Sequence, residues 1–168
     1  MTDTRPIDLS GVGHYQIQFL ERSVKAREAY DADDLKRSLL QKEHDEDSVA
    51  YKVGAQSLTD LGVIKLRIRM MTETDEMMAT VDQVTEWHLK DDEELSTEQV
   101  KDFLTRFGIQ RALPIVVSAL ADLARAVDAT PAGPPADFED EIKRMIADYN
   151  SSPDKPAPDE DEYHTSSN

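Results

Sequence analysis

The histidines are the residues of this 168-residue chain best suited to acid–base or metal chemistry. They lie in four separate segments, and none has a second histidine at the spacing of a metal site: His14, His44, His88 and His164. The count of 0 cysteines excludes thiol nucleophiles, disulfides and thiolate-bound metals. We therefore expect solvated histidines and no metal ion.

Motifs for nucleotide binding and for hydrolysis are also missing from the sequence. The segment Gly11-Val12-Gly13 lacks both the third glycine and the preceding strand of a dinucleotide fingerprint. No P-loop, G-x-S-x-G elbow or H-E-x-x-H motif occurs. Acidic runs such as Asp91–Glu94 precede a helix start, where acids usually favour solubility and the helix dipole. The sequence thus predicts a protein that is not an enzyme and binds no cofactor.

The chain is strongly acidic, with 35 acidic against 19 basic residues and a net charge of -16. Such a field repels phosphate backbones and anionic lipid surfaces, and it attracts basic partners. The polar residues 1–10 do not resemble a secretory signal, and the sequence predicts no apolar run near the roughly 20 residues of a membrane span. We expect a cytoplasmic protein that binds no nucleic acid and does not insert into membranes.

Alternation of apolar and polar residues predicts four strands, over residues 15–22, 49–58, 63–71 and 77–89. For the first of these a helix is the alternative, because residues 21–32 are rich in helix formers. In the third, Lys65, Arg67 and Arg69 share one face, where they could pair across strands with Asp82 and Glu86. Short turns between the later strands predict an antiparallel meander with one apolar and one charged side.

The pattern then changes to a helical period. Ser96 and Gln99 form a capping box, and Gly108 supplies a helix stop. A longer helix is expected to start near Pro114 and to end near Val127, before a proline-rich break. The sequence predicts a disordered lead over residues 1–12, an α+β domain over 13–135 with two or three helices on one face of a four-stranded sheet, an additional helix over 136–150 and a disordered acidic tail over 151–168.

Apolar side chains are more numerous around the junction of sheet and helices than one sheet with two short helices can easily bury. Residues of this kind are most often core, but a surplus on a highly charged protein indicates oligomerisation or client binding. The candidates for a client groove or an oligomer interface are Met78, Trp87, Phe103, Phe107, Leu113 and Ile115.

The order of these elements resembles the SecB family of export chaperones. Tyr15-Gln16-Ile17-Gln18 is similar to the opening of the family's first strand, Val63–Ile68 to a later alternating strand, and Leu113-Pro114-Ile115 to the start of its long helix. Ile115 stands where the family usually has an aromatic residue. The resemblance implies a dimer of dimers whose apolar grooves hold unfolded chains without nucleotide or metal. Divergent relatives protect an antitoxin in toxin–antitoxin systems.

Two hypotheses of different classes follow from the sequence. The first is an ATP-independent holdase for unfolded or partly folded polypeptides, serving either an export motor or an antitoxin. The alternative is a non-enzymatic adaptor or structural protein that uses the same apolar surface to dock one folded partner.

Overall fold

One antiparallel sheet forms the body of the protein in the computed structural model, which describes residues 6–7, 9–38, 48–58, 62–90, 95–148 and 164–167. Its strands are β1 (Val12–Ala26), β2 (Ser48–Leu58), β3 (Val63–Glu73), β4 (Met77–Leu89) and β5 (His164–Ser167). They lie in the order β1-β4-β3-β2-β5. The antiparallel α+β class is confirmed. The sheet has five strands instead of four, because residues 164–167 add an edge strand within the tail that was expected to be disordered.

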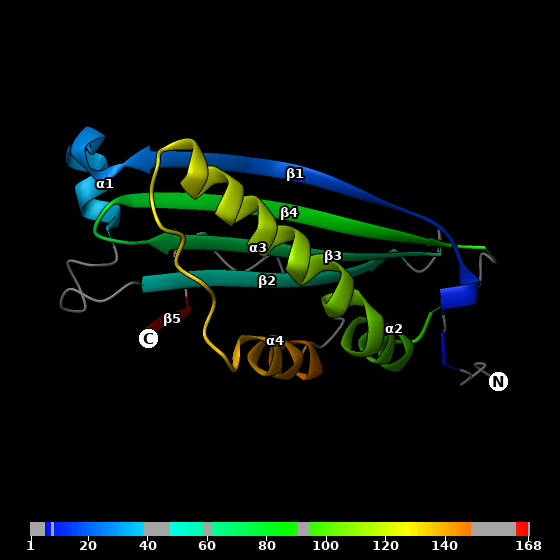
Figure 1. Ribbon diagram of the computed structural model, residues 1–168. Coiled ribbons are helices and arrows are strands. Elements are labelled where there is room, and N and C mark those ends of the chain that lie inside the picture. Colours follow the sequence, from blue (N-terminus) through cyan, green and yellow to red (C-terminus); the bar gives the residue numbers. More distant parts are fainter. Residues whose placement is uncertain are drawn as a thin grey trace.

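The helices of the described chain are α1 (Ala32–Arg37), α2 (Thr97–Phe103), α3 (Ile109–Ala126) and α4 (Phe138–Ala147). Figure 1 shows α3 crossing the sheet obliquely, with α4 beside its lower strands and α1 at one end. Residues from α2, α3 and α4 share one hydrophobic core with the sheet. Helix α4 therefore belongs to the same packed unit as the sheet.

The face of the sheet under the helices is apolar because the strands alternate as the sequence predicts. In β3, Ile64, Leu66, Ile68 and Met70 are all 0% exposed. The β3–β4 register places Trp87 opposite Ile64, so the β4 residues that share this face enter the same core. Burial of such a continuous apolar layer is the main stabilising contribution to a domain of this size.

The opposite face of the sheet carries the predicted cross-strand ion pairs. The Nζ atom of Lys65 lies 2.6 Å from Glu86, and Arg67 donates two hydrogen bonds to Asp82 at 2.6 and 2.9 Å. Arg69 lies 3.1 Å from Glu21 of β1. The hydrogen bond from Lys65, followed by that from the Gln16 amide, lowers the pKa of Glu86. This face is thus a mostly paired charged layer, as expected.

Helices α2 and α3 are continuous, which corrects the predicted stop at Gly108 and the start at Pro114. The capping box at Ser96 and Gln99 is present, but a π-helical segment, Leu104–Gly108, joins α2 directly to α3. A Cβ atom at Gly108 would lie 2.8 Å from Leu104 and 3.5 Å from the ring of Trp87. The tight contact is with the Leu104 side chain one turn earlier in the same helical run, so Gly108 makes room for that side chain and does not end the helix.

The resulting helical run, Thr97–Ala126, has 30 residues and is long and apolar enough to cross a membrane by length and composition alone. This differs from the absence of such a run expected from the sequence. Much of its apolar side packs on the sheet, where Val100, Phe103, Ile109 and Val116 are at most 1% exposed. The core helix of a globular domain passes the same length test.

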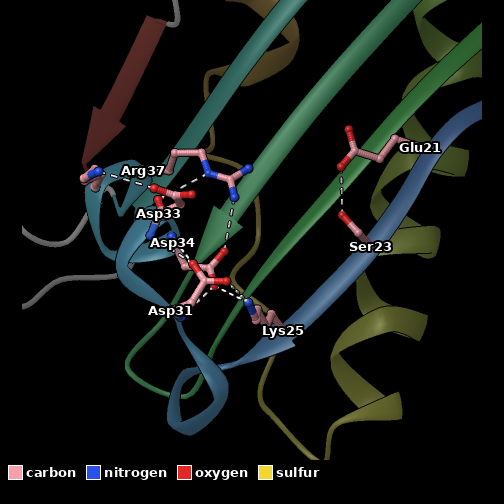
Figure 2. A network of polar contacts seen from close by, with 8 residues as sticks. Glu21, Ser23, Lys25, Asp31, Asp33, Asp34 and Arg37 are labelled. Atoms are coloured by element: carbon pink, nitrogen blue, oxygen red, sulfur yellow. Dashed lines mark hydrogen bonds and ion pairs between the residues drawn. The ribbon is translucent and has the colours of Figure 1, made fainter.

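A polar network fixes α1 to the end of the sheet. Asp31 caps the helix by accepting hydrogen bonds from the backbone N–H groups of Asp33 and Asp34, both at 2.9 Å. Lys25 of β1 contacts both Asp31 and Asp34, and Figure 2 shows these side chains converging below Arg37. The acidic connection that follows β1 therefore contains a helix anchored to that strand. The rest of that connection, residues 39–47, lies outside the described chain.

Candidate functional site

Exposed apolar side chains gather on β1, on the face of the sheet that carries the helices. Tyr15 is 57% exposed, and Ile17 and Phe19 are each 37% exposed. The β1–β4 register pairs them with Trp87, Thr85 and Gln83, which lie on the buried face of β4. These three β1 residues, called here the β1 strip, extend the apolar face of the sheet beyond the area that the helices cover.

A shallow groove of about 310 Å³ lies between α3 and the Phe19 end of the β1 strip. Phe19 and Arg22 line it from β1, and the α3 side is lined by Pro114, Ile115, Ser118, Ala119 and Asp122. Because α3 crosses the sheet obliquely, it lies over the central strands and leaves part of β1 uncovered (Figure 1). The groove and the β1 strip together form an apolar surface with polar groups at its margin.

The charged groups of the groove come one from each wall. The guanidinium carbon of Arg22 lies 4.9 Å from the ring centre of Phe19, an arrangement in which a cation contacts an aromatic face. Asp122 is paired with Arg125 on the same helix. A ligand in this groove would therefore meet apolar surface with a cation and an anion beside it, which suits a polypeptide segment better than a strongly charged small molecule.

Polar groups are also buried on the sheet face, beside the groove. Gln83, which pairs with Phe19 across the strands, is 0% exposed, and its amide nitrogen donates to the hydroxyl of Thr85. Its amide oxygen has no hydrogen-bond partner. Among the described residues, no three His, Asp or Glu side chains are placed to hold a metal ion together.

The structure distributes the six predicted site residues over three environments. Trp87 and Phe103 are buried in the core, where their rings meet edge to face at 5.5 Å. Phe107 and Leu113 are partly buried against that core. These four residues pack in or against the core, which is the more common position for apolar residues of this kind. The rings of Trp87 and Phe103 have no surface free for a partner.

The remaining two predicted residues lie in different layers, Met78 in the sheet on β4 and Ile115 in helix α3. Met78 is 9% exposed and pairs with Glu73 and Lys25, on the charged side of the sheet. Ile115 alone among the six lines the groove. The candidate site is thus centred on Ile115 and the β1 strip.

The β1 strip is the part of the site that the sequence prediction did not include. The alternation of Tyr15, Ile17 and Phe19 placed them on one apolar strand face, but a strand face of this kind is normally covered. Whether a helix reaches it depends on the crossing angle of α3, which no local pattern encodes. The sequence signal that could have indicated this site was the run of aromatic and β-branched residues in a strand that could lie at a sheet edge.

Comparison with solved structures gives a match at the level of the fold. The SecB-like chaperone Rv1957 of Mycobacterium tuberculosis, in complex with a ChAD peptide from the Rv1956 HigA1 antitoxin, aligns with a TM-score of 0.52 and 11% identity. The alignment covers 72% of this chain and 88% of that chain. The fold is SecB-like.

Other comparisons add little to this result. A protein of unknown function from Streptococcus agalactiae aligns over 71% of this chain and 93% of its own, with 12% identity and a TM-score of 0.30. No protein-family model and no curated protein sequence matches the chain. The SecB-like relationship is therefore a distant one that concerns the fold.

Proposed function

We propose that this protein is an ATP-independent chaperone, a holdase, that binds extended segments of non-native polypeptides on the β1 strip and the adjoining groove. The observation that carries the proposal is the exposed apolar surface of Tyr15, Ile17 and Phe19 beside Ile115, on a chain with a net charge of -16. Apolar surface binds non-native segments, and the surrounding charge keeps the complex soluble. The proposed activity is binding alone, with no catalytic step and no cofactor.

The SecB-like fold supports this proposal because the fold neighbour is a chaperone solved with a peptide from an antitoxin. We propose the same class of partner here: an unfolded or partly folded polypeptide, delivered to an export motor or belonging to an antitoxin. A cytoplasmic location is proposed with it, since both tasks concern newly made chains.

A homo-oligomer, with a dimer of dimers as the expected form, belongs to the same proposal. Strand β1 has 15 residues and, within the described chain, pairs only with β4. Its other edge can pair with β1 of a second copy and bring two apolar strips together. The β1 strip would then serve the interface, the client or both.

Two charge substitutions on β1 test the proposal. Ile17→Asp places a charge in the β1 strip, and Gln18→Asp places the same charge on the adjacent residue, which is exposed on the other face of the sheet. We expect Ile17→Asp to weaken binding of a reduced, carboxymethylated test protein at least about tenfold, whereas Gln18→Asp leaves it within about twofold. Fluorescence anisotropy measures both affinities.

A second pair of variants tests the other wall of the groove. Ile115→Asp is compared with Gln110→Asp, an exposed position of α3 that does not line the groove. Loss of binding in Ile115→Asp alone supports the groove. Unchanged binding in both Ile17→Asp and Ile115→Asp would contradict the site, and selective binding of one folded protein would favour the adaptor alternative.

A further inference from the structure

The outer edge of β2 is only partly covered by the strand beside it. Strand β3 pairs with β2 along its whole length, from Ser48 opposite Glu73 to Leu58 opposite Val63. On the other side, β5 pairs only with residues 48–51. Within the described chain, residues 52–58 therefore have a strand neighbour on one side alone.

The sequence of β2 lacks the usual protection of a sheet edge. Natural edge strands are shortened, charged, interrupted by proline or bulged to prevent pairing with other chains. The eleven residues of β2 contain Lys52 as their one charged residue and no proline, and their pairing with β3 runs without a register shift. The opposite edge strand, β1, carries Glu21, Arg22 and Lys25 and has an irregularity between Phe19 and Glu21.

The strand that occupies this edge is a weak competitor for it. Strand β5 is the four-residue polar segment His-Thr-Ser-Ser, which belongs to the same chain as β2. Four residues can form only a few backbone hydrogen bonds, each with a modest net contribution in water. An extended segment rich in β-branched residues could pair along all eleven residues of β2 and would gain more from each position.

We propose that the β2 edge is a strand-addition site for an extended, β-rich segment of a polypeptide partner, and that residues 164–167 occupy it until such a segment displaces them. The inference deepens the proposed function and rests on it for the class of partner. The β2 edge would be a second contact surface, on the side of the sheet opposite β1. Strand β5 competes for this edge and so lowers the affinity of the edge for a partner segment.

Removal of β5 is the first test. The probe is a fluorescein-labelled peptide of eleven residues, the length of β2, in which Val alternates with Thr and one Lys stands at each end. We expect a chain ending at Tyr163 to bind it about tenfold more tightly than the full chain. The truncation removes no acidic, Lys or Arg residue, so the net charge of -16 is retained. Ser166→Pro, which disrupts β5 at full length, should have the same effect.

Backbone methylation of the probe is the second test. A strand added to a sheet edge uses every second N–H group, so methylation of one alternating set should abolish binding while methylation of the other set is tolerated. This readout depends on the backbone and would not respond to capture by apolar side chains. Equal binding of the two methylated peptides would overturn the inference.

The results separate this inference from the proposed function. If the unfolded test protein binds and responds to Ile17→Asp, but truncation and methylation change nothing, the strand-addition site is wrong and the holdase stands. If the two methylated peptides bind with different affinities while no unfolded protein binds, the holdase proposal is wrong and the β2 edge is a site for a defined segment. If no probe binds either form of the chain, both are wrong.

Discussion

Single residues of β4 show where this fold departs from a purely apolar core. Gln83 and Thr85 lie among buried residues on the helix side of the sheet, and each is at most 1% exposed. A buried amide oxygen without a partner costs about 1–3 kcal/mol relative to a satisfied one. Their position next to the β1 strip places this cost at the candidate site.

The double variant Gln83→Leu/Thr85→Val is therefore expected to be more stable than the natural sequence. Replacing both partners of the hydrogen bond removes the unpaired oxygen without leaving a new one, and the gain should be about 1 kcal/mol in the free energy of unfolding. Gln83→Leu alone should gain less, because the Thr85 hydroxyl then loses its donor. Urea denaturation measures all three proteins, and a loss of stability in the double variant would contradict the assignment.

The network around α1 predicts a dependence of stability on pH. The backbone N–H of Asp34 and the ammonium group of Lys25 hold the pKa of Asp31 well below its usual range. The stabilisation is present above the unfolded-state pKa, about 3.9, and is lost as the pH falls toward the folded-state value. Asp31→Asn should thus be less stable than the natural sequence at pH 7, and the difference should shrink below about pH 4.

Urea denaturation over a pH series checks this expectation. Asp33→Asn, in the same helical turn, is the matched control, since Asp33 is exposed and does not contact Lys25 in the described network. A difference for Asp31→Asn that stays constant from pH 7 to about pH 2.5 would show that its carboxylate has no special pairing.

At the scale of elements, period-two and helical patterns predicted most of the structure correctly. The β2, β3 and β4 ranges, the capping box and the charged face are all encoded by neighbouring residue types, which local physics reads directly. Three features were not predictable in this way: the continuous α2–α3 helix, strand β5 and the uncovered β1 strip. Each depends on contacts between segments far apart in sequence, such as Gly108 against Trp87.

Helix α4 provides a prediction at this scale. Ile142 is 0% exposed and belongs to the core shared with the sheet. Ile142→Ala should lower the free energy of unfolding by about 2–5 kcal/mol, whereas Arg144→Ala, on the exposed side of α4, should change it by less than about 0.5 kcal/mol. Thermal or urea denaturation measures the stability of the two variants. Equal effects would mean that α4 is not part of the folded unit.

At the scale of the molecule, the acidic charge and the exposed apolar surface have complementary effects. Apolar surface promotes association, and a net charge of -16 opposes aggregation of the protein and of a client bound to it. Together with the SecB-like fold, this combination is what the proposed binding of unfolded chains requires. The β2 edge would add backbone pairing to the same task.

Light scattering after size-exclusion chromatography, with and without a reduced, carboxymethylated test protein, measures both the proposed assembly and the proposed binding of unfolded chains. We expect an oligomer, with a mass near four times 18.9 kDa, that co-elutes with the unfolded protein. A monomer that elutes apart from the unfolded protein would contradict both the proposed assembly and the proposed holdase activity.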